Sequence, residues 1–178
     1  MSEFTTALVV SPLSDGKSWV ILQEFKYHVG SESSNDIIVV SKGFVTDFTS
    51  VPRLFWLVIP KWGKYGNAAV IHDWLYWQQS DKRDRKTADS IFLEAMVVLN
   101  VSRWKRKVIY DAVRLFGWIA WNRNKIDKVH GVKRVIDTKE IKATMSSKRP
   151  GTIQSAYKYY VNKNQTEENS ADAENDNK

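Results

Sequence analysis

The stretch "NAAVIHDWLYWQQ", residues 67–79, decides the fold, because an extended pattern gives way to a helical one there. Its Ala, Val, Leu and Trp residues are typical of a helix packed in a core, yet His72 and Asp73 lie in its middle. Burying a polar pair among apolar side chains is costly unless each group finds a partner. The pair therefore indicates either satisfied hydrogen bonds in the core or a chemical role.

Two more helices are predicted downstream of this stretch. The first ends in the polar segment "QQSDKRD", and a second is expected over about 85–99. A third is expected over 103–124, with Ser102 as its N-cap. Apolar residues occur on more than one side of this third helix, which predicts that it lies at the centre of a bundle.

The pattern upstream is that of strands. Three runs rich in β-branched residues lie within about residues 5–45: "TALVVSPL", "SWVILQEFKYHV" and "DIIVVSKGFV". In the second run Ile21, Phe25 and Tyr27 share one face, while Lys26 falls on the other. A three-stranded antiparallel meander is the simplest arrangement of these runs.

The predicted fold class is therefore α+β, with an N-terminal antiparallel β-meander followed by a three-helix core. Residues 1–160 are expected to form a single domain, in which an active-site-like loop at 46–66 joins the strands to the helices at about 67–124. A basic C-terminal segment covers 125–160, where "VKRVIDT" is compatible with a short strand. Residues 161–178 are expected to be a disordered acidic tail.

Charge is distributed unevenly along the chain. The formal net charge is +7 over 178 residues, but fourteen Lys/Arg against four Asp/Glu lie between Arg103 and Arg149. Such a region suits an anionic partner, either a nucleic acid or an anionic lipid surface, or else is simply a solvated basic face. We do not expect nucleic acid, because no groove-reading motif is present.

The sequence also bears on the compartment. There is no cysteine, and the N-terminal residues show no basic segment followed by an apolar one. No run approaches the ~18 apolar residues that span a bilayer. We therefore expect synthesis in the cytoplasm, with no signal peptide or transmembrane segment, and any membrane contact to be peripheral.

The helix spacing brings three polar side chains together. His72 and Tyr76 are four residues apart and share a face. The connection to the next helix is short, so the two helices should pack antiparallel, with Asp89 facing His72 and Tyr76. A carboxylate that accepts a hydrogen bond from one imidazole nitrogen leaves the other nitrogen free to act as a general base. These three residues are the candidate catalytic group.

Asp73 is rotated by about 100° from His72 and faces the irregular segment that contains Asp47. Two carboxylates with loop carbonyls are the hard oxygen ligands that calcium prefers, so Asp47 and Asp73 are the candidate metal ligands. A zinc site is not expected, because His28 and His130 lack ligand spacing to His72 and there is no cysteine.

The residues "AAVIHDWLYW" and "DRKTADSIFLEAM" resemble the two-helix core of phospholipase A2 enzymes, especially the small bacterial, fungal and parvoviral forms. The resemblance implies that His72 is the base, that Asp73 binds calcium and that Asp89 orients the histidine, with Tyr76 as a supporting hydrogen-bonding partner. "TDFTSVP" resembles the upstream calcium loop of the bacterial forms, with Asp47 as a ligand and Thr49 in place of a cysteine.

The sequence departs from those enzymes in three ways. The bracing disulfide is absent, the glycine-rich calcium loop of the secreted animal enzymes is absent, and the N-terminal meander has no counterpart in the small lipases.

Over about residues 5–120 the chain resembles a phage-borne family, domain of unknown function number 1353. The matching segments are "FVTDFTSVPRLFW", "AAVIHDWLY", "ADSIFLEAM" and "IYDAVRLFG". This resemblance implies a phage or prophage origin, and hence a location in the host cytoplasm or the virion, and implies no activity.

Two functions remain open. The first is a calcium-dependent lipolytic hydrolase whose loop "RLFWLVIPKW" enters an anionic membrane surface while the basic segment holds phospholipid headgroups. The second is a non-enzymatic phage protein, either a virion component or an inhibitor of a host factor, that binds a phage or host protein. In that case the His72 network is structural. Exposure of one His72 nitrogen to a cleft would favour the enzyme.

Overall fold

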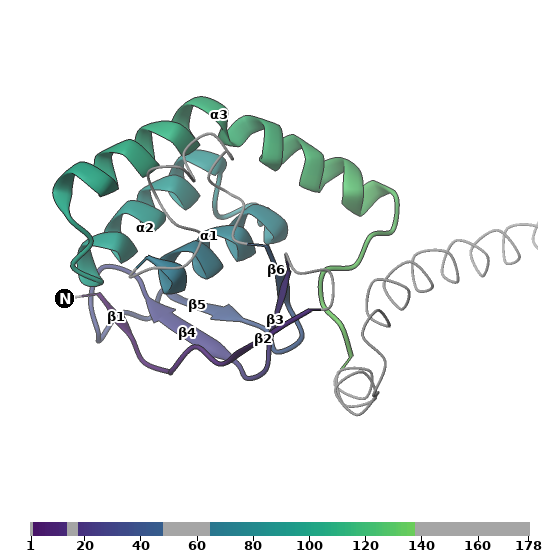
Figure 1. Cartoon of the computed structure of the whole chain (residues 1–178), viewed down its shortest axis with the longest axis horizontal. Coiled ribbons are helices and arrows are strands. Elements are labelled where there is room, and N and C mark those ends of the chain that lie inside the picture. The colour runs from purple at the N-terminus through teal and green to yellow at the C-terminus, as the bar shows by residue number, and fades with distance from the viewer. Residues whose placement is uncertain (1, 14–17, 48–64, 138–178) are drawn as a thin grey trace, which may run out of the picture.

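Figure 1 shows a computed structural model in which residues 2–13, 18–47 and 65–137 are described. In these parts of the chain six short strands precede three helices, which confirms the predicted α+β class. The strands are β1 (Glu3–Phe4), β2 (Val10–Pro12), β3 (Trp19–Ile21), β4 (Phe25–His28), β5 (Ile37–Val40) and β6 (Val45–Thr46). The helices are α1 (Gly66–Gln78), α2 (Arg85–Val98) and α3 (Arg103–Val129).

The strands form two small antiparallel sheets, ordered β1-β4-β5 and β2-β3-β6, where the sequence suggested one meander. The difference arises in the run 18–29, which bends at Gln23 and gives β3 to one sheet and β4 to the other. The Gln23 side-chain amide donates to the carbonyl of Ala7 at 2.9 Å and anchors this bend. The predicted alternation is present, because Phe25 and Tyr27 are fully buried while the residues between and after them are not.

Helix α1 is the centre of the molecule. Eleven of its 13 residues are buried, since it packs against both other helices and against strands β5 and β6. A helix that is apolar on all sides is stable only when it is surrounded in this way. Strands β1 to β5 and all three helices contribute to one hydrophobic core around α1, and a smaller cluster of Leu13 and Val20 lies against Val45 of β6.

Helix α3 is not central, so that prediction is wrong. Its buried residues are few: Ile109, Ala112, Val113, Gly117 and Asn124. Figure 1 shows α3 as the outer layer, over α1 and α2 on the side away from the sheets. Its apolar residues on the opposite side are exposed, because α1 already occupies the centre.

Side chains of α3 fix the C-terminal end of α1. The Asn124 amide donates to the carbonyl of Tyr76 at 3.0 Å, and the Lys128 ammonium donates to the carbonyl of Gln78 at 2.8 Å. The last carbonyl groups of a helix lack partners within it, so these bonds satisfy groups that would otherwise be unpaired. The position of Tyr76 is thereby tied to α3.

The segment after α3 returns to the strands. A short strand was expected at 132–138. In the structure Val135 forms only an isolated antiparallel bridge with Phe44. Gly43 permits this approach: its φ is +88°, and a Cβ there would overlap the carbonyl oxygen of Ile136.

Several predictions lie outside the described residues. These are most of the loop at 46–66, the basic segment beyond residue 137 and the acidic tail at 161–178. Within the described ranges, no helix combines the length and the apolar character needed to cross a bilayer.

Candidate functional site

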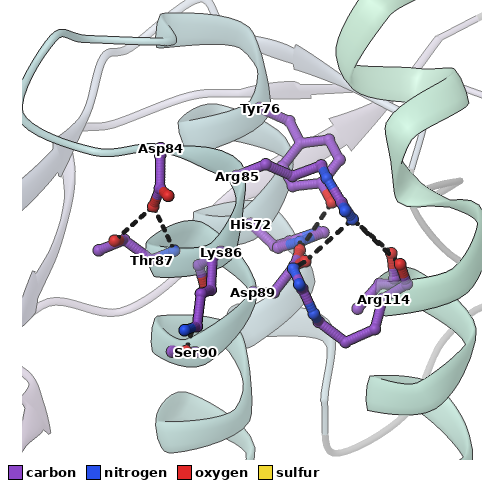
Figure 2. Close-up of polar contacts among 10 residues, drawn as sticks. His72, Tyr76, Asp84, Arg85, Lys86, Thr87, Asp89, Ser90 and Arg114 are labelled. Carbon is purple, nitrogen blue, oxygen red and sulfur yellow. Dashed lines mark hydrogen bonds and ion pairs between the residues drawn. The ribbon is translucent and has the colours of Figure 1, made fainter.

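The structure brings His72, Tyr76 and Asp89 into contact, as the helix spacing predicts. The His72 Nε2 atom lies 2.9 Å from Asp89 Oδ1, and the Tyr76 hydroxyl donates to the same oxygen at 2.6 Å (Figure 2). Helices α1 and α2 are joined by a short connection at 79–84, which sets them side by side and places these residues opposite one another. All three side chains are buried.

Aromatic rings hold the imidazole in place. The His72 ring stacks on Phe92 with centroids 4.5 Å apart and lies 4.1 Å from the Tyr76 ring at a tilt. Offset and tilted contacts of this kind stabilise aromatic pairs in a core. The imidazole therefore has a fixed orientation as well as a fixed hydrogen bond.

The second oxygen of Asp89 faces two arginines. Arg114 Nη1 donates to Asp89 Oδ2 at 2.6 Å, and Arg85 Nη1 approaches the same atom at 3.4 Å (Figure 2). Arg85 also donates to two carbonyls of α3, those of Val113 at 3.3 Å and Arg114 at 3.2 Å. Asp89 thus receives hydrogen bonds on both oxygens, and the arginines join α2 to α3.

These contacts keep Asp89 ionised. Burial alone would raise the pKa of Asp89, but the hydrogen bonds from His72, Tyr76 and Arg114 outweigh it, and the pKa is lowered from its ordinary value of 3.8. An ionised carboxylate only accepts hydrogen bonds, so His72 Nε2 must carry the proton of this bond.

His72 itself is neutral at physiological pH. Burial lowers the pKa of His72 from its ordinary value of 6.5, and the opposing effect of Asp89 does not restore it. A neutral imidazole with its proton on Nε2 has a lone pair on Nδ1. Nδ1 is therefore the ring atom of His72 that can accept a hydrogen bond.

The Nδ1 atom of His72 has no hydrogen-bond partner among the described residues, although it is buried. His72 as a whole has an exposed fraction of 0%. Buried polar atoms are nearly always paired with protein groups or ordered water, so an unpaired nitrogen of this kind calls for an explanation. In the described part of the chain it is the only buried side-chain nitrogen or oxygen atom without a hydrogen-bond partner.

Asp73 is directed toward Thr46 of strand β6, the residue before the irregular segment that it was predicted to face. Its exposed fraction is 4%, and the hydroxyl of Thr46 donates to its Oδ2 atom at 2.5 Å. Asp47 follows Thr46 directly in the chain, so the two predicted metal ligands come from segments that are in contact. Carboxylate oxygens suit calcium. The described residues contain no group of three or more His, Cys, Asp or Glu side chains that could hold a metal ion.

Helix α3 passes directly over the Tyr76 hydroxyl. A Cβ atom at Gly117 would overlap that hydroxyl and lie 3.3 Å from Tyr76 Cζ and 3.5 Å from Arg85 Nη1. Burial and the hydrogen bond to Asp89 both raise the pKa of Tyr76, so its hydroxyl stays protonated and donates. Gly117 is therefore required for α3 to close over the site.

Four of these residues are not among the predicted site residues: Thr46, Arg85, Arg114 and Gly117. The i, i+4 spacing of Arg85 and Asp89 is a signal that could have identified Arg85. Arg114 and Gly117 lie on α3, and only the three-dimensional packing brings them to Asp89 and Tyr76. Thr49 and the aromatic loop at 53–62 lie outside the described residues.

The fold and site define a class: an α+β protein with a buried His–Asp–Tyr group between two antiparallel helices, in which two arginines pair with the aspartate. The chain matches the family described as "Protein of unknown function (DUF1353)" over residues 19–113, more than half of its length. The protein belongs to this family. No curated protein and no solved structure matches the chain.

Proposed function

We propose that the protein is a calcium-dependent, phospholipase A2-like ester hydrolase of phage origin that acts on phospholipid at a membrane surface. The observation that carries this proposal is the Nδ1 atom of His72, a buried nitrogen without a hydrogen-bond partner among the described residues. Its orientation is fixed through Nε2 by Asp89. A neutral imidazole held in this way is arranged to accept a proton.

In the proposed reaction His72 Nδ1 takes a proton from a water molecule as the water oxygen attacks the ester carbonyl. The imidazolium that forms is stabilised by Asp89, whose negative charge is maintained by Arg114 and Arg85. The proton on Nδ1 then passes to the leaving alcohol oxygen, which breaks the ester bond and restores the neutral imidazole. General-base catalysis of this kind contributes about 10²–10⁴-fold in rate.

Asp73 and Asp47 are the residues that would hold calcium, with Thr46 beside them. When bound, calcium supplies positive charge that polarises the ester carbonyl. Calcium titration by isothermal calorimetry tests this part directly: we expect binding by the wild type and its loss in Asp73→Asn. Asp81→Asn, on the connection between α1 and α2, is the matched control. Equal binding by wild type and Asp73→Asn would exclude Asp73 as a ligand.

A membrane surface is the proposed place of action because of the chain's charge. The excess of Lys and Arg between Arg103 and Arg149 suits anionic phospholipid headgroups. The resemblance to a phage-borne family supports an origin in a phage, with the protein in the host cytoplasm or the virion. A calcium site made of few oxygen ligands would be filled mainly outside the cell.

A second candidate is a non-enzymatic phage protein in which the same network is structural. The complete burial of His72 favours it, because a catalytic base must be reached by water and substrate. In that case the protein would act by binding a phage or host protein, and the His72 site would serve only to pack α1, α2 and α3.

Fatty-acid release from vesicles that contain phosphatidylglycerol separates the two candidates. The hydrolase predicts release that needs calcium and falls by about 10²–10⁴-fold in His72→Gln. His130→Gln, which removes an exposed histidine after α3, is the matched control and should retain full activity. The absence of release by a folded wild type with calcium present would contradict the hydrolase and leave the structural candidate.

A further inference from the structure

Helix α3 presents an apolar stripe on its outer side. The exposed fractions of its six members range from 53 to 80%, which is far above those of the buried core. The members are Trp104, Leu115, Trp118, Ile119, Ile126 and Val129. At 3.6 residues per turn these positions fall on one side of the helix, within roughly 100° of arc, where Asp111 and Asn122 are the polar residues between them. We call this set the outer stripe.

The outer stripe is opposite the face that packs on the protein. Ile109, Val113 and Gly117 are buried and lie about half a turn away from it. In Figure 1 the side of α3 away from α1 and α2 is the outermost part of the helical layer. A row of large, exposed apolar side chains along one helix marks an interaction surface.

Basic side chains border the stripe along both edges. Lys107 and Lys125 fall on one edge, and Lys105 and Arg123 fall on the other. Helix α3 contains eight Lys/Arg against two Asp, so its net charge is strongly positive. The Lys105 ammonium lies 5.5 Å from the centroid of the Trp104 ring, at the start of the stripe.

We propose that the outer stripe is a docking surface for an anionic lipid membrane, with α3 lying in the plane of the interface. An apolar face that contains Trp and is bordered by Lys and Arg is the pattern of helices that bind at this depth. The Trp rings suit the boundary between apolar and hydrated zones, and the cations suit the headgroups. This inference rests on the proposed function only for the reason why the protein would bind a membrane. The binding itself can be measured without hydrolysis of the lipid.

Two other occupants fit the stripe less well. A second copy would bring two strongly basic helices together, and their like charges would repel. The acidic segment 162–178 of this chain has the opposite charge, but its only apolar residues are two alanines, so it cannot cover large aromatic and aliphatic side chains. An anionic lipid surface matches both the charge and the apolar character.

The test is co-sedimentation of the full chain with vesicles of phosphatidylcholine alone or with about one third phosphatidylglycerol. We expect binding only to the anionic vesicles and weakening by added salt, since the headgroup attraction is screened. Trp118→Gln/Ile119→Gln should lower the affinity more than tenfold, because both apolar side chains lose their burial in the bilayer. Lys107→Gln/Lys125→Gln should lower it by roughly 25-fold, at about 1 kcal/mol per cation.

The controls are matched in chemistry and lie off the stripe. Val97→Gln replaces an exposed apolar residue of α2, and Lys86→Gln/Lys133→Gln removes two exposed cations outside α3. Both should bind like the wild type. The absence of wild-type binding, or equal binding by wild type and Trp118→Gln/Ile119→Gln, would overturn the proposal. So would a dimer in sedimentation equilibrium that Trp118→Gln/Ile119→Gln dissociates.

Hydrolysis of a short-chain, water-soluble ester by the same variants separates this inference from the proposed function. Vesicle binding without hydrolysis of either substrate would uphold the docking surface and remove the hydrolase. Hydrolysis of the soluble ester without vesicle binding would uphold the hydrolase and remove the docking surface.

Discussion

At the scale of single residues, Asp89 links the catalytic candidates to the third helix. One of its oxygens receives His72 and Tyr76, and the other receives Arg114 and Arg85. A buried carboxylate is stable only when its charge is matched in this way. The same contacts fix the tautomer of His72, so the stability of the core and the proposed chemistry depend on one set of bonds.

The lowered pKa of His72 predicts a pH dependence of stability. Below about pH 6.5 the unfolded chain takes up a proton at His72 that the folded chain excludes, so the free energy of unfolding decreases as the pH falls. Asp89 adds a second decrease below pH 3.8, because its folded pKa is also lowered and its stabilising charge is lost on protonation.

Urea unfolding between pH 8 and pH 5 measures the first of these decreases. We expect His72→Gln to flatten the profile over this range, since the variant has no group at that position to protonate. His130→Gln serves as the matched control for the loss of a histidine. A profile for His72→Gln as steep as that of the wild type would show that the decrease arises elsewhere.

At this scale the sequence predicted the residues that contact His72, but it did not predict the arginine that pairs with Asp89 from α3. The i, i+4 spacing of His72 and Tyr76 and the short connection to α2 were sufficient to place Asp89 correctly. Arg114 could not be found in the same way, because it is 25 residues from Asp89 and on another helix.

At the scale of the elements, the packing of α3 on α1 depends on Gly117. The absence of a side chain there lets α3 approach the Tyr76 hydroxyl, although glycine lowers helix stability by about 1 kcal/mol relative to alanine. The close approach also brings Arg114 to Asp89. Gly117 therefore determines whether the site is closed.

Gly117→Ala should lower the free energy of unfolding by about 1–3 kcal/mol, the usual cost of overpacking, despite the higher helix propensity of alanine. Tyr76→Phe removes the hydroxyl that the new Cβ would overlap, so it should recover part of that loss in the double variant. Chemical denaturation of the four proteins gives the coupling. Strictly additive effects would contradict the proposed contact.

The sequence predicted the helices better than their layering. The starts of all three helices and the ends of α1 and α2 were expected within one residue of those observed, whereas α3 continues five residues beyond its expected end at 124. Apolar spacing marks these limits locally; Asp84 caps α2 with its side chain, while Ser102 is the N-cap of α3 without a side-chain capping hydrogen bond. The position of α3 was predicted wrongly, because apolar residues on several sides of a helix can face either a core or an exposed surface. The structure decides between these two possibilities, because α1, with eleven of its 13 residues buried, occupies the centre.

At the scale of the whole molecule, a pair of hydrogen bonds to Glu94 helps to join the β1-β4-β5 sheet to the helices. The Tyr27 hydroxyl on β4 donates to Glu94 Oε1 on α2 at 2.8 Å, and the Gly30 amide donates to the same oxygen at 2.9 Å. Burial raises the pKa of Tyr27, so the hydroxyl remains a donor. The sheet is thereby fastened to the helix that also contains Asp89.

Tyr27→Phe should lower the free energy of unfolding by about 1 kcal/mol, the net contribution of one hydrogen bond, and should leave the aromatic packing intact. Amide hydrogen exchange should be accelerated more in β4 and β5 than in α1, since the sheet loses one of its hydrogen bonds to α2. Glu24→Gln, at an exposed acid beside β4, is the control. Unchanged stability in Tyr27→Phe would show that this contact does not fasten the sheet.

The division of the strands into two sheets could not be predicted from the sequence. The apolar residues at odd positions resume at Phe25 after the polar Gln23, so the sequence is compatible with one continuous strand. In the structure Val20 and Ile21 are both buried, and the pairing partners change at Gln23. Strand pairing depends on contacts between distant segments, which a pattern along one run does not encode.

The most direct test of the central claim is the tautomer of His72, measured by ¹⁵N NMR of its side chain at neutral pH. The account predicts a neutral ring with the proton on Nε2 and an unprotonated Nδ1, because Asp89 is an ionised acceptor at Nε2. A proton on Nδ1 would contradict it, since that nitrogen would then have no lone pair with which to accept a proton from water.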